Sequence, residues 1–203
     1  MSGREEIFAS IRANRPKLER ALPAVPLFDE HRPAPLLAAF KESLEHMGGI
    51  FLDPPTGGDT LAPVRAKVAN AKVVCSTVPE IAGNRDIAVV KEPQDLADVD
   101  FAIVRASFAV AETGSVLLSE ADLHANAVAY LAQHLIVLLD PADIVVNLHH
   151  AYRRPEFRDR HYASFHTGPS ATADIEGVLI HGAQGVRSLS VLPIARATGN
   201  PSH

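Results

Sequence analysis

From residue 36 onward, helix-like and strand-like apolar patterns alternate along the chain. Leu36, Phe40 and Leu44 share one face of an expected helix that Gly48 ends, and a second helical pattern covers residues 61–68. Segments with strand-like patterns lie at residues 50–52, 72–75, 101–104, 135–139 and 186–194. Because connecting helices make successive strands parallel, this alternation predicts an α/β fold, mainly a parallel sheet flanked by helices.

A β-hairpin is expected to interrupt this alternation. Residues 108–111 and 115–118 are strand-like and flank Glu112, Thr113 and Gly114. Gly114 permits the positive φ of a tight turn, so the sequence predicts an inserted hairpin with Glu112 at its tip. A carboxylate there is suited to act as a nucleophile or general base, and equally suited to accept hydrogen bonds from turn amides.

The connection after residues 161–166 carries hydroxyl groups, glycines and carboxylates. Residues 161–166 alternate like a half-buried strand, which Gly168 and Pro169 would end. Ser170 is predicted to cap the N-terminus of one or two helical turns whose free amides face the end of the sheet. Such amides, with nearby hydroxyls, bind phosphate or carboxylate groups. The alternative is a well-capped turn that binds no ligand.

These two segments together are the candidate functional site. Glu112 is the candidate catalytic residue, and the candidate substrate-binding residues are Thr113, Gly114, Thr167, Gly168, Ser170, Thr172, Asp174 and Glu176. The last two carboxylates also fit a simpler role, in which they complement the positive end of a helix dipole. His166 and His181 are further candidates, as proton donors, because an imidazole titrates near neutrality.

Two local patterns add predictions about the core. Asp140 and Pro141 form a helix-start signal, and the spacing of apolar residues after them predicts a helix over residues 141–152. Cys75 lies in a strand-like run, where a buried and inert thiol in a central strand is expected.

The N-terminal region is predicted to be separate from the α/β domain. Residues 4–12 form an amphipathic helical pattern, and five prolines between residues 16 and 35 predict an extended linker. The expected division is a helix with a proline-rich linker at residues 1–35 and one α/β domain at residues 36–203. The helix has an apolar face that would pack on its own domain or on a second subunit, which makes a homo-oligomer possible.

Composition excludes several classes of function. The net charge of −5 offers no general attraction to nucleic acid, and no apolar run approaches the roughly 20 residues of a membrane-spanning helix. The single cysteine fits a reducing, cytoplasmic environment. Glycine-rich nucleotide-binding loops are lacking, and the ten histidines show no metal-ligand spacing, so no metal site is expected.

An arginine-rich stretch precedes the second candidate segment. Its members are Arg153, Arg154, Arg158 and Arg160. A solvated or subunit-contact loop is expected there, with attraction of an anionic substrate as the alternative.

Three segments resemble the LUD-domain family in order and separation. They are residues 111–115, 140–145 and 167–177, and the opening residues 4–12 are also similar to the family's first helix. The chain departs from the family pattern at Ala171, where an arginine is common. The resemblance covers nearly the whole chain.

The resemblance implies a fold similar to the sugar-phosphate isomerase and coenzyme A transferase superfamily. It also implies a subunit of an iron–sulfur-dependent L-lactate oxidation system, which binds a small carboxylate or a partner while companion subunits carry the clusters. One cysteine cannot supply the thiolates of a cluster, so no cofactor is expected in this chain. The alternatives are a free-standing enzyme acting on a coenzyme A thioester or sugar phosphate, and a noncatalytic binding or scaffold protein.

Overall fold

The main sheet of the protein is parallel throughout. A computed structural model describes residues 3–16, 21, 23–30, 32–33, 35–172, 180–181 and 185–196. The order of the five strands is β1 (Ile50–Phe51), β11 (Ser188–Pro193), β6 (His134–Leu139), β3 (Phe101–Arg105) and β2 (Val74–Ser76). Every neighbouring pair is parallel. The expected α/β class with a mainly parallel sheet is therefore confirmed.

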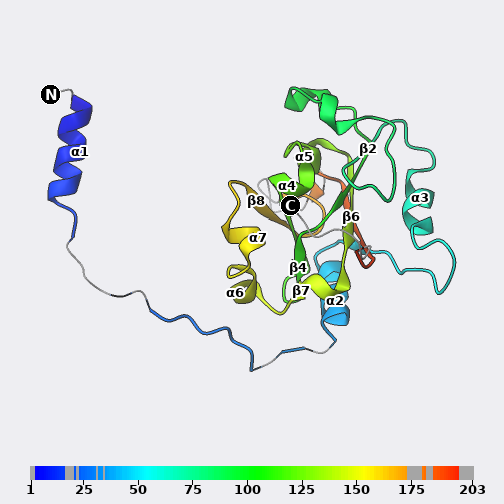
Figure 1. Cartoon of the computed structure of the whole chain (residues 1–203), viewed down its shortest axis with the longest axis horizontal. Helices are drawn as coiled ribbons and strands as arrows, with labels where there is room; N and C mark the ends of the chain where they lie inside the picture. The colour runs from blue at the N-terminus through cyan, green and yellow to red at the C-terminus, as the bar shows by residue number, and fades with distance from the viewer. Residues whose placement is uncertain are drawn as a thin grey trace.

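Apolar side chains bury both faces of this sheet. Val104 and Val137 point to the face covered by α2 (Leu36–His46), where they share a core with the helix residue Leu44. Ile103 and Ile136, each adjacent in sequence to one of these, belong to the core on the other face, under α3 (Ala62–Val68). Alternate strand residues point to opposite faces, so a sheet covered on both sides needs continuous apolar runs. Figure 1 shows α2 and α3 on different sides of the strands.

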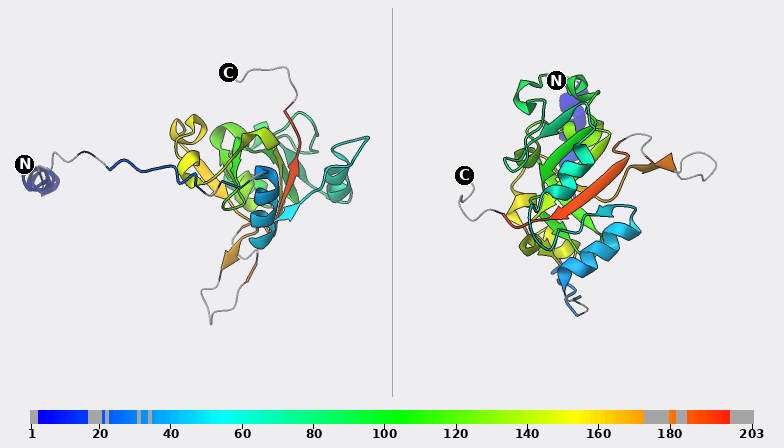
Figure 2. Two further views of the ribbon diagram at one scale, coloured as in Figure 1. Left: turned by 90° about the horizontal axis from the view of Figure 1, so that it is seen from below. Right: turned by 90° about the vertical axis from the view of Figure 1, so that its right-hand side faces the viewer.

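The expected hairpin forms the centre of a second sheet. Its four strands lie in the order β7 (Ile144–Val145), β4 (Phe108–Val110), β5 (Ser115–Ser119) and β8 (Ala163–His166). β4 and β5 are antiparallel, β8 is antiparallel to β5, and β7 is parallel to β4. A separate antiparallel pair, β9 (Ala171–Thr172) and β10 (Ile180–His181), projects from the body in both views of Figure 2.

Short helical segments fill most connections. The α-helical ones are α4 (Glu120–Leu123), α5 (Val128–Leu131), α6 (Leu148–Ala151) and α7 (Pro155–Arg158). The 3₁₀ segments are η1 (Ile87–Val89), η2 (Pro93–Leu96) and η3 (Pro141–Asp143).

The predicted helix over residues 141–152 is wrong. Asp140 does cap a turn, because its carboxylate accepts the N–H of Ala142 at 2.9 Å, but that turn is only η3. Ile144 and Val145 then pair with β4 as strand β7. Both are β-branched residues that favour strands once a partner is available, and helix resumes only at α6, which Asn147 caps.

Two further predictions need correction. Ser170 does not begin a helix: its N–H donates to the carbonyl of Val186 at 2.9 Å, and strand β9 follows. Cys75 is buried as expected, at 1% exposure, but it lies in β2, which is an edge strand of the main sheet and not a central one. The backbone of Arg85 forms a bridge beside Cys75.

The N-terminal helix forms but buries none of its residues. Ile7, Phe8 and Ile11 of α1 (Gly3–Ala13) are exposed, and Figure 1 shows α1 apart from the rest of the chain. Part of the linker does contact the body, since the Asn147 side chain donates to the carbonyl of Leu27 at 2.7 Å. The division at residue 35 and the docking of α1 remain predictions. None of the described helices is both long enough and apolar enough to cross a bilayer.

Candidate functional site

Pairing of β5 with β8 brings the two candidate segments together. The register places Val116 opposite His166, so Ser115 and Thr167 meet at the ends of the two strands. Their hydroxyl oxygens form a hydrogen bond. The Thr113 hydroxyl lies 2.7 Å from the same Ser115 oxygen. Three hydroxyl groups from the hairpin and from the end of β8 therefore form one hydrogen-bonded chain.

The C-terminal end of α2 packs tightly against both segments. Gly114 has φ +65°, and a Cβ there would lie 2.3 Å from the backbone nitrogen of Leu44. Gly168 has φ +66°, and a Cβ there would lie 2.1 Å from the carbonyl oxygen of Met47. Because these are contacts with backbone atoms, neither can be relieved by a side-chain rotation. Glycine at both positions lets α2 close one side of the site.

These three segments enclose a pocket of about 560 Å³. We call it the hairpin pocket, and its described lining residues are Glu42, Ser43, His46, Met47, Glu112, Thr113, Ser115 and Thr167. Two carboxylates face this pocket, and no lysine or arginine is among its described lining residues. An anion in the hairpin pocket would therefore depend on hydroxyl donors and on His46.

Glu112 is held in place from two sides. One carboxylate oxygen accepts the backbone N–H of Leu148 at 3.2 Å, at the start of α6. Its own carbonyl oxygen accepts the Ser43 hydroxyl at 3.3 Å, from α2. Glu112 therefore joins the hairpin tip to two helices while its side chain still lines the pocket. The bonded amide belongs to α6 and not to the hairpin turn, so this contact differs from the expected bond to turn amides, and a catalytic role for Glu112 stays a prediction.

The second candidate segment divides between two cavities. Thr167 lines the hairpin pocket and also a smaller cavity of about 280 Å³, whose lining includes His166, Gly168 and Ser170. Ser170 does not line the hairpin pocket in the part of the chain that the structure describes.

The remaining candidates of this segment cannot be placed. Asp174 and Glu176 lie outside the described residues, as do the side chains of Thr172 and His181.

His166 is half-buried in the wall of the smaller cavity. Its ring centroid lies 5.1 Å from that of Tyr130, and its Nε2 is buried without a hydrogen-bond partner among the described residues. Burial lowers the pKa of His166 to about 4. The imidazole is therefore neutral at pH 7, so the expectation that His166 titrates near neutrality is wrong.

Burial of His166 makes the protein less stable in mild acid. The unfolded chain takes up a proton near the ordinary imidazole pKa of 6.5, whereas the folded chain takes it up only near 4. The free energy of unfolding is therefore expected to fall by roughly 3 kcal/mol as the pH drops from 7 to below 4, at about 1.4 kcal/mol per pH unit. Urea unfolding at several pH values should show this loss, and His166→Phe should remove it. His161→Phe, at an exposed histidine, is the control, and equal pH profiles for the two variants would contradict the assignment.

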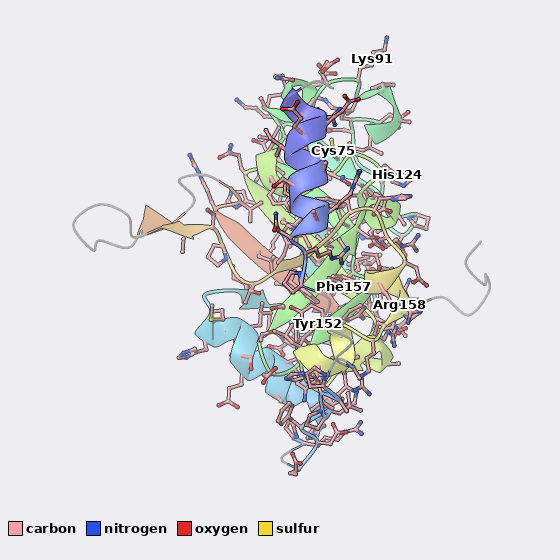
Figure 3. All side chains as sticks on the ribbon, turned by 90° about the vertical axis from the view of Figure 1, so that its left-hand side faces the viewer. Cys75, Lys91, His124, Tyr152, Phe157 and Arg158 are labelled. Atoms are coloured by element: carbon pink, nitrogen blue, oxygen red, sulfur yellow. The ribbon has the colours of Figure 1, made fainter. Side chains whose placement is uncertain are left out.

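The arginine-rich stretch lies away from the hairpin pocket. Arg153 donates to the carbonyl of Val25 at 2.9 Å, in the linker, and Arg154 pairs with Glu156 at 2.6 Å. Near them, Tyr152 and Phe157 pack with ring centroids 5.1 Å apart (Figure 3). Arg153 therefore holds the linker, and Arg154 holds local structure.

Cys75 does not fit an iron–sulfur cluster. Such clusters need several thiolates, and burial raises the pKa of this single thiol, which disfavours its thiolate form. Among the described residues, no group of three or more histidine, cysteine, aspartate or glutamate side chains is placed to hold a metal ion.

Comparison with known proteins identifies the family. The model of the LUD domain matches residues 83–193, which is more than half of the chain and includes the hairpin and β8. The chain belongs to the LUD-domain family. LUD domains are associated generally with lactate utilization.

A solved structure supports the fold of this LUD domain. A crystal structure described as a DUF162 family protein from Deinococcus radiodurans superposes with a TM-score of 0.57 at 16% sequence identity. The match covers 77% of this chain and 94% of that one. At this identity the match bears on the fold alone. Comparison with curated proteins finds no significant match.

Sequence reasoning missed the contribution of α2. Ser43, His46 and Met47 line the hairpin pocket, whereas the apolar spacing of this helix predicts only its apolar face. The available signal was the hydroxyl and imidazole side chains on the last turns of a helix that ends in two glycines.

Proposed function

We propose that this LUD domain is a cytoplasmic subunit of an iron–sulfur-dependent L-lactate oxidation system, of the kind called lactate utilization protein C. In this proposal the chain acts by binding and positioning, and its partner subunits carry the clusters. Membership of the LUD-domain family supports the lactate system. The lone, buried Cys75 supports a role without electron transfer through this chain.

The observation that carries the binding role is the hairpin pocket. Its volume of about 560 Å³ is in the range of pockets that take ligands far larger than a three-carbon acid. Glu42 and Glu112 would repel a free carboxylate, and both would attract a basic group. We therefore propose that the occupant is a segment of an iron–sulfur partner subunit with a basic side chain, which Glu112 and the linked hydroxyls of Ser115 and Thr167 would bind.

An enzyme acting on coenzyme A thioesters or sugar phosphates has less support at this pocket. Phosphate recognition usually employs arginine, lysine or a helix N-terminus. The described lining of the hairpin pocket contains neither cation, and no helix begins at Ser170.

Binding to purified iron–sulfur subunits tests the proposal. Glu112→Gln keeps an acceptor for the Leu148 N–H but removes the charge, so it is expected to weaken the complex about tenfold, the effect of one charge-assisted hydrogen bond. The matched control is Glu45→Gln, on the same end of α2 but outside the described pocket lining. Affinity is measured by calorimetry and lactate-dependent electron transfer by dye reduction.

Three results would each contradict a part of the proposal. Lack of both complex formation and lactate-dependent electron transfer with the iron–sulfur subunits would reject the lactate system. Equal affinities of the Glu112→Gln and Glu45→Gln variants would reject the hairpin pocket as the docking site. Saturable binding of free lactate in the pocket would show that its ligand is a small carboxylate and not a segment of a partner subunit.

A further inference from the structure

A second pocket lies at the N-terminal edge of the main sheet. Its volume is about 400 Å³, and we call it the sheet-edge pocket. Lys72 precedes β2, Phe101 begins β3, His134 begins β6 and Arg187 precedes β11. Parallel strands start at the same edge, so four segments far apart in the sequence meet there. No described residue lines both this pocket and the hairpin pocket.

Three cationic side chains line the sheet-edge pocket without ion-pair partners. They belong to Lys67, Lys72 and Arg187, and none forms a salt bridge within the described part of the chain. Half of the other described arginines are paired with carboxylates, for example Arg65 with Asp59 at 2.7 Å. In a chain of net charge −5, a cavity with three unpaired cations is a local reversal of the overall charge.

The single acidic residue of this pocket is already engaged. One carboxylate oxygen of Asp100 accepts the backbone N–H groups of Lys72 at 2.7 Å and Val73 at 3.0 Å. These two bonds lower the pKa of Asp100 and keep the carboxylate on the β2 backbone. Asp100 therefore does not neutralise all three cations.

An aromatic wall and neutral donors complete the pocket. The rings of Phe101 and His134 stack with centroids 4.7 Å apart, and a hydrogen bond of 2.8 Å between His134 Nδ1 and the Ser188 hydroxyl orients the imidazole. Burial, followed by the charges of Arg187 and Lys67, lowers the pKa of His134. Both cations therefore act on the same ring, in agreement with a shared cavity. Side chains of Asn70 and Gln133 also line it.

We propose that the sheet-edge pocket binds a small, multiply charged phosphate anion. Three cations from separate elements match a ligand with several negative oxygens better than they match a single carboxylate. The amides would donate to further oxygens, and the stacked rings would limit access of water on one side. This site is independent of the proposed docking of a partner at the hairpin pocket.

Calorimetric titration of the full chain with inorganic diphosphate tests this site. At constant ionic strength we expect saturable binding with one site per chain. Lys67→Gln and Arg187→Gln are each expected to weaken it about tenfold, because each removes one charge-assisted contact. The matched control is Lys91→Gln, an exposed lysine outside the described pocket lining that is labelled in Figure 3 and is expected to bind like the wild type. Circular dichroism checks that all three variants are folded.

Three outcomes would overturn the inference. The first is the lack of saturable diphosphate binding by the wild-type chain. The second is an equal loss of affinity in Lys91→Gln, which would indicate attraction by overall charge. The third is equal binding of citrate, a small carboxylate anion of similar charge, which would show that phosphate is not the group recognised.

Discussion

Replacing Gly114 with alanine is expected to destabilise the protein by about 3 kcal/mol and to distort the hairpin pocket. The residue has φ +65°, which costs an L-residue about 1 kcal/mol, and the new Cβ would lie 2.3 Å from the Leu44 nitrogen and 2.6 Å from its Cα. Relief of that overlap requires the hairpin and α2 to move apart, at a further cost of about 2 kcal/mol. Urea unfolding would measure the loss.

Gly58→Ala distinguishes the cost of a positive φ from the cost of overlap between the new Cβ and α2. Gly58 has φ +82°, but nothing lies within 4 Å of the position that a Cβ would take. This variant should therefore lose only the backbone contribution of about 1 kcal/mol. Equal losses at Gly58 and Gly114 would show that α2 is not packed against the hairpin tip as described. The Gly114→Ala variant should also bind the iron–sulfur partner more weakly, since Glu112 and Thr113 flank the displaced turn.

Removal of the Arg105 side chain is expected to cost about 3 kcal/mol or more. The Arg105 side chain is 12% exposed, and its guanidinium forms an ion pair with Glu80 and donates to the carbonyl of Ile194 at 3.3 Å. The other Glu80 oxygen is buried without a partner among the described residues. In Arg105→Met the carboxylate would stay partly buried without its counter-charge, which is the costly way to break such a pair.

A double variant distinguishes this cause from loss of packing. Arg105→Met combined with Glu80→Met removes both charges and should recover most of the stability. Arg158→Ala is the control, because the Arg158 and Asp159 side chains are 68% and 59% exposed, and no measurable change in unfolding is expected. A double variant as unstable as Arg105→Met would contradict an unpaired charge as the cause.

The strands of the core were predictable because the signal for them is local. A strand buried on both faces needs an uninterrupted apolar run, and the runs at residues 101–104 and 135–139, which became most of β3 and β6, have this property. The hairpin was equally local, since Gly114 supplies the positive φ of its turn.

Local sequence patterns predicted the wrong secondary structure where a segment forms hydrogen bonds with a strand or loop far away in the sequence. The cap at Asp140 formed, but pairing of Ile144 with Ala109 of β4 stopped the helix that the spacing favoured. The N–H of Ser170 likewise bonds to Val186 instead of beginning a helix. Helix propensities and strand propensities each vary by only about 1 kcal/mol among ordinary residues, so tertiary hydrogen bonding and packing decide such segments.

By itself, the sequence determined the parallel α/β core, the hairpin and the family motifs, because these depend on apolar runs, turn glycines and residue order along the chain. Tertiary structure alone decided which side chains share a cavity. The β5 and β8 register joins Ser115 to Thr167, and α2 closes that site. Because the parallel strands start at the same edge, Lys72 and Arg187 both line the sheet-edge pocket. Contacts between residues so far apart in sequence depend on strand order and register, which no local pattern encodes.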